Sequence, residues 1–256
     1  MVNEQPETQE QNGVPEHLQK LADLSLSPDA SPVLVPFTVK EVDLWKDFIE
    51  YKENRKSWDN WREEDWKKNH PPYIHEIFNC WPTLETPRLR LRLLRDDDLE
   101  DAFRVLSNPI AMKWYGTSAH ENVEFTRKQH VELLKTRFKY RDAASFVITL
   151  KEEDKYVGHV NAFQFDRTFK FVEIAYIVDP KLWNQGIGTE AVRRVVEFLR
   201  DDMKIHKIRA GLYANNIASK RVLEKCGFVQ EGYLRDNVLM NGEFEDEYVM
   251  AYIASN

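Results

Sequence analysis

Two patterns of hydrophobic and polar residues alternate along most of this chain. Short runs rich in β-branched and aromatic residues, typical of strands, occupy residues 88–94, 145–151, 156–165, 170–178 and 207–213, with two more near 230–239 and 244–253. Apolar residues at the spacing of amphipathic helices occupy residues 96–106, 121–140, 187–204 and 217–226. Strands joined by crossover helices predict an α/β domain with a mixed sheet.

Residues 182–191 read Leu-Trp-Asn-Gln-Gly-Ile-Gly-Thr-Glu-Ala and join a predicted strand to a predicted helix. A tight turn at a helix start leaves backbone N–H groups unpaired at the positive end of the helix dipole. Such a turn can bind a phosphate, and Gly186 and Gly188 let the backbone approach it closely. We therefore expect an anion site here, although a turn that merely connects strand and helix is the simpler alternative.

The same turn also fits the relaxed dinucleotide-binding pattern Gly-x-Gly-x-x-Ala. That pattern requires an acid about 20 residues further on, at the end of the next strand, to hold a ribose. Here the strand at 207–213 ends in Ala214-Asn215-Asn216, which contains no carboxylate. The sequence therefore argues against a nicotinamide cofactor.

A second segment, residues 215–228, reads Asn-Asn-Ile-Ala-Ser-Lys-Arg-Val-Leu-Glu-Lys-Cys-Gly-Phe. Asn216 can cap a short helix, while Gly227 supplies a left-handed stop and Phe228 an apolar contact after it. The two segments, at this separation, resemble the GCN5-related N-acetyltransferase (GNAT) superfamily. Their residues are similar to its RimJ/RimL-like branch, which acetylates protein N-termini and other amines.

Two further segments carry the same resemblance. Thr86 to Arg92 is similar to the first strand of that branch, and Asn241 to Asp246 is similar to its closing hairpin. The resemblance covers Leu84 to Ile253. It implies a GNAT fold, with a mixed central β-sheet flanked by helices. It also implies that the strands at 170–178 and 207–213 splay apart, so that acetyl-CoA enters from one side and the amine from the other.

The resemblance also implies how acetyl-CoA, the expected cosubstrate, is held. The pyrophosphate would contact the backbone of Gln185, Gly186, Ile187, Gly188 and Thr189, and the pantetheine arm would contact Tyr176, Ile177, Val178 and the helix that Asn216 begins. A bulge would free an N–H near Ile177 for the thioester oxygen, a donor of the kind worth about 3 kcal/mol of barrier. Glu190 is expected to stabilise the helix start.

Two residues are candidates for catalysis. Ser219 matches the position that supports the departing thiolate in the family, although a Ser near a helix start often bonds only the local backbone. Glu173 lies on the strand from which many GNAT enzymes offer their general base, although it can equally be an edge or solvent-facing residue. The sequence departs from the family at Leu223, where some members have a tyrosine acid, and at Val238, where RimL-type members have a glutamate.

These departures bear on the acceptor. Bringing a protein α-amine of pKa about 7.8 to its neutral form at pH 7 costs about 1 kcal/mol, whereas a lysine of pKa about 10.4 costs about 4.6 kcal/mol. A site without an obvious strong base therefore favours an α-amine, or another amine of lowered pKa. The sequence predicts an N-acetyltransferase acting on a primary amine, either a protein N-terminus or a small amine.

The N-terminal third has a different composition. Residues 1–36, rich in Glu, Gln, Ser and Pro, are expected to be disordered. Residues 37–82 hold five of the seven tryptophans and are expected to form a helical extension to an acetyltransferase domain at 83–256. Its aromatic residues either pack onto that domain or form an exposed face for a partner. The alternative function is therefore a GNAT-fold protein that binds the cofactor but works through a partner bound to this extension.

Composition narrows the remaining possibilities. The net charge of −7 argues against a nucleic-acid partner, and no apolar run approaches membrane-spanning length. Two distant cysteines exclude a disulfide framework and a thiolate metal site, so a cytoplasmic protein is expected. His75-Glu76 lacks the second histidine of a zinc motif, and no metal is expected. His159 is interpreted as a packed or surface residue. The sequence does not choose between a monomer and a homodimer.

Overall fold

The computed structural model describes residues 77–166, 170–240 and 242–254. The chain divides between Lys68 and Asn69 into two compact units, and all of these residues belong to the second. The expected disordered tail at 1–36, and the expected extension up to residue 76, lie outside the described residues. Within the described part of the chain, no helix is long and apolar enough to cross a membrane.

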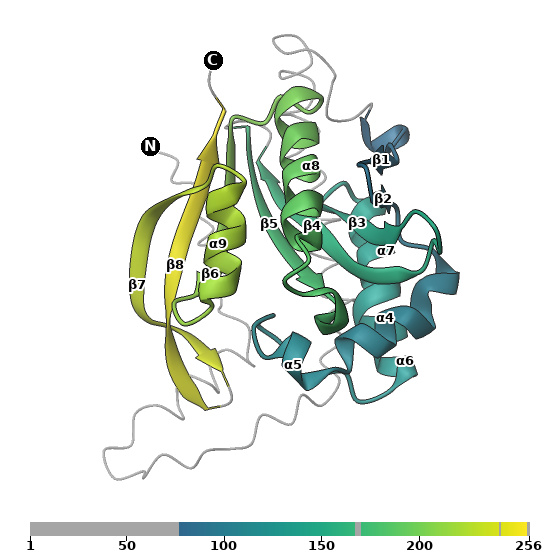
Figure 1. Cartoon of the computed structure of the whole chain (residues 1–256), viewed down its shortest axis with the longest axis horizontal. Coiled ribbons are helices and arrows are strands. Elements are labelled where there is room, and N and C mark those ends of the chain that lie inside the picture. The colour runs from purple at the N-terminus through teal and green to yellow at the C-terminus, as the bar shows by residue number, and fades with distance from the viewer. Residues whose placement is uncertain (1–76, 167–169, 241, 255–256) are drawn as a thin grey trace, which may run out of the picture. The chain divides into compact units, whose positions relative to one another are not determined.

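The second unit is built on a single mixed sheet (Figure 1). Its strands are β1 (Leu84–Glu85), β2 (Leu89–Arg92), β3 (Ala143–Leu150), β4 (Tyr156–Asp166), β5 (Phe171–Val178), β6 (Lys207–Tyr213), β7 (Val229–Met240) and β8 (Glu243–Ile253). They lie in the order β1-β2-β3-β4-β5-β6-β8-β7. Every neighbouring pair is antiparallel except β5 and β6, which run parallel.

Helices cover both faces of the sheet. The helical elements are η1 (Asp96–Asp98), α4 (Leu99–Leu106), α5 (Pro109–Met112), α6 (Val123–Thr126), the π-helix η2 (Arg127–Glu132), α7 (Leu133–Lys139), η3 (Pro180–Leu182), α8 (Ile187–Asp201) and α9 (Ile217–Lys225). Helices α8 and α9 lie over one face of the sheet (Figure 1). The apolar stripe of α8 is buried there in the main core, to which α9 also contributes. A smaller core forms where α4 and α5 pack on the opposite face. Burying each large apolar side chain stabilises this layering by roughly 1.5–3 kcal/mol.

The architecture confirms the predicted α/β fold, and most predicted elements agree within a few residues. The short elements β1 and α5 were not predicted, because two or four residues are too few to show a periodic pattern. In α5, Pro109 stands at the helix start, and the side chain of Asn108 accepts hydrogen bonds from Ile110 N and Ala111 N. A run of this kind is recognised by its cap and not by its periodicity.

The described end of the expected N-terminal extension packs with this unit. Trp81 lies in a cluster of aromatic rings, with its ring centroid 5.0 Å from that of Phe78 and 5.0 Å from that of Phe146. Phe138 of α7 and Phe198 of α8 complete the cluster. Of the two alternatives for the tryptophans of the extension, Trp81 follows the first and packs as an ordinary core residue.

Candidate functional site

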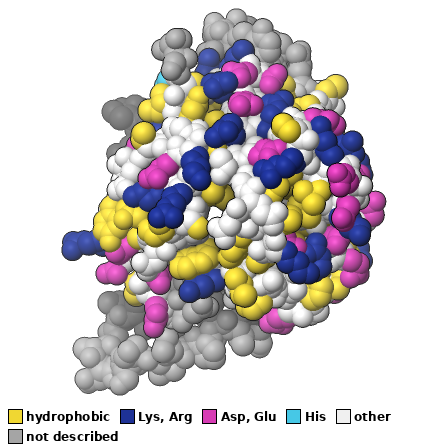
Figure 2. All heavy atoms as spheres, viewed as in Figure 1, with side chains coloured by type: hydrophobic (Ala, Val, Ile, Leu, Met, Phe, Trp, Pro, Cys, Tyr) yellow, Lys and Arg dark blue, Asp and Glu magenta, His cyan; other side chains and the backbone are white. Residues whose placement is uncertain are grey.

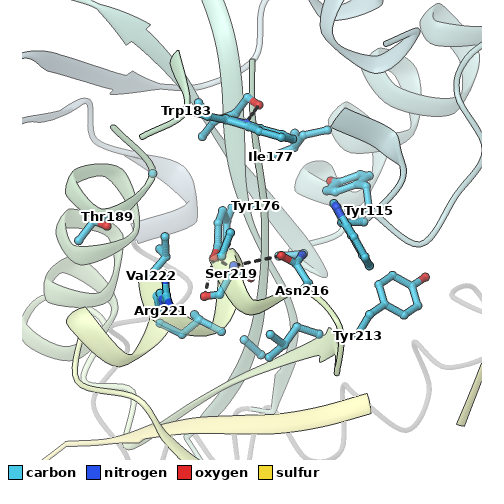
Figure 3. A pocket seen from close by; sticks show the side chains of 18 of the residues that line it. Tyr115, Tyr176, Ile177, Trp183, Thr189, Tyr213, Asn216, Ser219, Arg221 and Val222 are labelled. Carbon is cyan, nitrogen blue, oxygen red and sulfur yellow. Dashed lines mark hydrogen bonds between the residues drawn. The ribbon is translucent and has the colours of Figure 1, made fainter. Parts of the chain in front are cut away.

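A cavity opens where β5 and β6 part. Phe171–Glu173 of β5 pair in parallel with Lys207–Arg209 of β6, and the ladder ends after these residues. A cavity of about 630 Å³ lies between the strands, and the 182–189 turn, α9 and the segment after α5 close it (Figure 3). The structure thus contains the splayed pair of strands that the sequence led us to expect.

The glycine turn forms one wall of this cavity. Gly186 is the N-cap of α8 and adopts the left-handed conformation, with φ of +78°. No side chain caps this helix, so the first N–H groups of α8 are available to an anion. Gly186, Ile187, Gly188 and Thr189 all line the cavity. The turn therefore presents an uncapped helix start to the cavity, and phosphate binding there stays a prediction.

Gln185 takes a different position from its four neighbours. Its side-chain Nε2 donates to the backbone oxygen of Lys181 at 3.0 Å, and it is not among the residues that line the cavity. Its own carbonyl accepts a hydrogen bond from Arg88 Nη1 at 2.8 Å. Its side chain therefore supports the turn, while the predicted contact of Gln185 with a cofactor stays a prediction.

A polar clamp ties the start of α8 to the beginning of the sheet. Glu190 accepts a hydrogen bond from Thr86 Oγ1 at 2.6 Å and another from Arg88 Nε at 2.7 Å. Burial acts to raise the pKa of Glu190, but these hydrogen bonds outweigh it and hold the pKa below its ordinary value. As expected from the sequence, Glu190 stabilises the helix start, and it does so by fixing α8 to the strand at Leu89.

Trp183 stands where the turn leaves β5. Its indole Nε1 donates to the backbone oxygen of Val178, the last residue of that strand, at 2.8 Å, and its ring lines the cavity (Figure 3). The tryptophan therefore satisfies a carbonyl that no strand partner takes, and it closes the cavity above β5. An apolar ring in this position offers no positive charge to an anion at the turn.

The expected bulge near Ile177 is absent. β4 and β5 pair residue by residue from Phe163–Glu173 to Gly158–Val178, and the register shifts only between Phe163 and Asp166. Tyr176, Ile177 and Val178 nevertheless line the cavity as predicted. The edge of β5 that faces the cavity is thus exposed by the departure of β6, and not by an irregularity in β5 itself.

Asn216 and Ser219 lie together at the start of α9. The Asn216 side chain accepts a hydrogen bond from Ser219 N at 3.1 Å, which confirms the predicted cap. Ser219 Oγ lies 2.7 Å from the hydroxyl of Tyr176, and both residues face the cavity (Figure 3). Burial raises the pKa of Tyr176 and the contact with Ser219 lowers it, with a net rise that keeps the phenol protonated. Ser219 is thus held by the side chain of Tyr176 from β5, in a contact in which either hydroxyl can be the donor.

The far end of α9 stops as the sequence predicts. Gly227 has φ of +90°, and Phe228 after it is buried in the main core. A side chain at Gly227 would also press on the ring of Tyr252, because an added Cβ would lie 3.2 Å from its Cε2. This stop fixes the length of α9 and thereby the position of its cavity-facing residues.

Glu173 lies outside the cavity. Its Oε2 is 2.6 Å from Arg209 Nη2, and the same guanidinium stacks over the ring of Phe171. Glu173 is the last residue of β5 in the ladder with β6, where it pairs with Arg209. Glu173 is not among the residues that line the cavity. A carboxylate neutralised by an arginine there is badly placed to take a proton from an amine in the cavity.

Several cavity residues were not singled out in the sequence. Arg221 and Lys225, one helical turn apart on α9, bring positive charge to the side of the cavity that faces α8. Figure 2 shows Lys and Arg side chains scattered among apolar and acidic ones over this face of the molecule. The i,i+4 spacing of these two basic residues in the second motif is the signal that could have identified them.

The opposite side of the cavity is aromatic and acidic. It is lined by Trp114, Tyr115, Tyr213, Val238 and Glu247. The rings of Trp114 and Tyr213 lie 6.3 Å apart. These residues come from three separate parts of the chain, so no local motif identifies them.

His159 is a packed residue, which was one of the two expectations for it. It is fully buried on β4. Its two ring nitrogens contact the hydroxyls of Tyr115 and Tyr156, and the ring of His130 lies 4.7 Å away. Burial, followed by the nearby His130, lowers the pKa of His159 well below its ordinary value, so the imidazole is neutral. This network fixes the Tyr115 ring at the cavity wall.

Comparison with known proteins bears on this site. Residues 88–229 match the family model described as Acetyltransferase (GNAT) domain. The protein named "Probable N-acetyltransferase YjcK" from Bacillus subtilis (strain 168) is 39% identical over 132 residues, which are 51% of this chain and 72% of that protein. The [Ribosomal protein uS5]-alanine N-acetyltransferase of Escherichia coli (strain K12) is 27% identical over 101 residues, 39% of this chain and 52% of that protein.

A solved structure shows the same fold. The spermidine N-acetyltransferase of Vibrio cholerae, determined in complex with CoA and spermine, aligns with a TM-score of 0.59 and 21% identity. The alignment covers 66% of this chain and 96% of that one. The family model spans more than half of the chain and includes the glycine turn, Tyr176 and the α9 segment. The chain is therefore a member of the GNAT family of N-acetyltransferases, and it is an acyltransferase enzyme.

Proposed function

We propose that this enzyme transfers the acetyl group of acetyl-CoA to a primary amine, either a peptide α-amine or a small amine. The observation that carries the proposal is the cavity between β5 and β6, which joins an uncapped helix start on one side to an aromatic and acidic wall on the other. An anionic cofactor fits the first side, and a cationic amine fits the second.

The cofactor side supplies binding. The N–H groups from Gly186 to Thr189 would hold the pyrophosphate, and Arg221 and Lys225 would add the positive charge that the apolar Trp183 does not provide. The unpaired edge of β5 from Tyr176 to Val178 would bond the amides of the pantetheine arm. CoA is bound in the related spermidine N-acetyltransferase structure, which supports this assignment.

Acetyl transfer needs three further events. The amine must lose a proton, the carbonyl oxygen must be stabilised as it becomes anionic, and the thiolate must leave. Ser219 is the candidate for the last event, because its hydroxyl lies at the cavity wall at the start of α9. If Tyr176 donates to Ser219 Oγ, the proton of Ser219 is free to point at the sulfur.

The acceptor is proposed to be an amine of low pKa. No strong base is built into α9, where Leu223 occupies the position of the tyrosine of other members, and Glu173 is paired with Arg209. An amine that is already partly neutral at pH 7 suits such a site, because a lysine would cost about 3.5 kcal/mol more to deprotonate. The uS5-alanine enzyme, which modifies an alanine by its name, is a precedent among the relatives.

The test is turnover of an amine panel, measured as release of free thiol from acetyl-CoA by the full-length protein. We expect a peptide with one free α-amine to react at least 10-fold faster than a matched peptide with one free lysine. A faster lysine peptide would overturn the preference for an α-amine. If acetyl-CoA stabilises the protein but no amine is acetylated, the alternative of a cofactor-binding protein that works through residues 1–82 is favoured.

A further inference from the structure

Glu247 brings a carboxylate to the cavity wall opposite the cofactor turn. In β8, its neighbours Tyr248 and Met250 belong to the core under α8 and α9. Because side chains alternate along a strand, Glu247 faces the other side of the sheet from Tyr248. It pairs with Tyr213 of β6, whose hydroxyl approaches the segment after α5 at Gly116. This is the side from which an amine would enter when acetyl-CoA occupies the side of α8.

Two features of the neighbouring strands hold this carboxylate in place. Gly211 of β6 leaves the space that Glu247 occupies, since a Cβ at residue 211 would lie 2.1 Å from Glu247 Oε1. Asn237 Nδ2 donates to Glu247 Oε2 at 2.6 Å. Asn237 reaches it because the pairing of β7 with β8 is irregular between Leu234 and Val238, which adds residues to β7 there.

The charge of Glu247 is not neutralised within the described residues. Its hydrogen bond from Asn237 is neutral, and no ion pair joins it to any lysine, arginine or histidine in the described ranges. Burial raises the pKa of Tyr213, and the charges of Glu247 and Glu245 raise it further, so the phenol is neutral too. The wall around Glu247 is therefore negative and partly aromatic, which suits a cation.

We propose that Glu247 binds the protonated amine of the acceptor and takes one proton from it before the nitrogen attacks. The inference rests on the proposed acetyltransferase function. Glu247 is the substitute, from β8, for the carboxylate that RimL-type members place where Val238 stands in this chain. Both residues line the same cavity, so the charge comes to the site from a different strand.

Glu247 accepts the first of the two protons that the amine nitrogen loses. One N–H bond of the ammonium breaks and its proton passes to a carboxylate oxygen of Glu247, which later releases it to water. The nitrogen lone pair forms the C–N bond with the thioester carbonyl carbon, and the C–S bond breaks. The second proton of the amine nitrogen is lost as the thiolate leaves and becomes the thiol. No oxidant, reductant or metal is required.

The same wall selects among amines. A free amino acid carries a carboxylate two bonds from its amine nitrogen, and Glu245 and Glu247 would repel it. A peptide N-terminus or a diamine carries no negative charge at that distance. The acceptor class is therefore a primary amine without an adjacent carboxylate.

The test compares E247Q with E243Q in the full-length protein, using thiol release with an α-amine peptide. Glu243 is an exposed residue of the same strand and face and does not line the cavity. We expect kcat/KM for the amine to fall by about 100-fold or more in E247Q, in the range typical of a general base, and to stay within twofold in E243Q. Acetyl-CoA affinity should be unchanged in both variants, because Glu247 lies on the amine side.

A second variant, G211A, keeps Glu247 but displaces its carboxylate. We expect at least a 10-fold loss of kcat/KM in G211A, and partial recovery in the double variant G211A/E247D, whose shorter side chain avoids the added methyl. An E247Q enzyme that folds and retains kcat/KM within threefold would overturn the inference while leaving the acetyltransferase function intact. If E247Q does not fold, an active G211A enzyme with unchanged kcat/KM overturns it. A wild-type protein that acetylates no amine would instead overturn the proposed function.

Discussion

Replacing Gly186 with alanine should weaken acetyl-CoA binding while leaving the protein folded. Gly186 has φ of +78°, a conformation that costs an L-residue about 1–2 kcal/mol. The added Cβ would meet only Arg88 Nη2, at 3.4 Å, which is the end of a flexible side chain. For a domain of this size the midpoint of thermal unfolding should therefore fall by roughly 2–8 °C without ligand.

The effect on binding has a separate origin. The methyl group would stand on the N-cap of α8, between the backbone and an approaching pyrophosphate. Displacing the anion from one charge-assisted hydrogen bond costs about 1.5–3 kcal/mol, which is a 10- to 150-fold loss of affinity. Gly242 provides a matched control, because it has φ of +85°, no atom within 4 Å of an added Cβ, and no place in the cavity.

The assay is calorimetric titration of acetyl-CoA into wild type, G186A and G242A, with thermal unfolding of each protein alone. We expect both variants to lose similar stability and only G186A to lose affinity. Wild-type affinity in G186A would refute the assignment of the anion site to this turn. Equal losses of affinity in the two variants would show that binding follows global stability and not local access to the turn.

Two further predictions concern side-chain networks around the cavity. If Tyr176 orients Ser219, then Y176F and S219A should each lower kcat by up to about 10-fold and the double variant should lower it no further; additive losses would contradict the coupling. Burial lowers the pKa of His130 to about 3, and that of His159 falls well below its ordinary value, so both bind protons only on unfolding. The stability that these neutral histidines contribute is therefore fully present above about pH 6.5. Below that pH the free energy of unfolding falls by about 1.4 kcal/mol per pH unit for each histidine. Between pH 7.5 and pH 5.5, urea unfolding should show a smaller fall in the free energy of unfolding for His130→Leu than for wild type.

The sequence predicted those parts of the site that are determined by a few consecutive residues. The left-handed Gly186, the Asn216 cap and the Gly227 stop each depend on the conformation of a few consecutive residues. A glycine at positive φ or an amide at a helix start has the same meaning wherever it occurs. The sequence therefore predicted the local geometry of the turn and of α9, although the bulge expected near Ile177 is absent and Gln185 does not line the cavity.

The parts that it could not predict depend on which strands lie side by side. Glu173 reads as a free carboxylate until the parallel ladder brings Arg209 next to it. Glu247 reads as one of several acids in a hairpin until Gly211 and Asn237 are seen to hold it. Strand register and the irregularity in β7 are properties of the assembled sheet, so neither contact has a signature in a single segment.

One buried pair shows the same limit at the edge of the sheet. Asp98 belongs to an acidic run at a helix start, but it is only 3% exposed and accepts two hydrogen bonds from Arg92, both at 2.8 Å. The pair fixes the start of α4 against β2. Its strength comes from bidentate geometry between residues of two different elements, which the local pattern of charges does not reveal.

The clamp between Arg88 and Glu190 makes the glycine turn part of the whole domain and not an independent module. Its two residues stand 102 positions apart in the chain, Arg88 next to β2 and Glu190 in the first turn of α8. The motif around Gly186 is a continuous stretch of ten residues. The conformation of this turn, however, is fixed only when the N-terminal strands have joined the sheet and Arg88 can contact Glu190. Acetyl-CoA affinity should accordingly report whether the N-terminal strands have joined the sheet. It should appear late in folding, and it should be lost early in unfolding, when the first strand detaches.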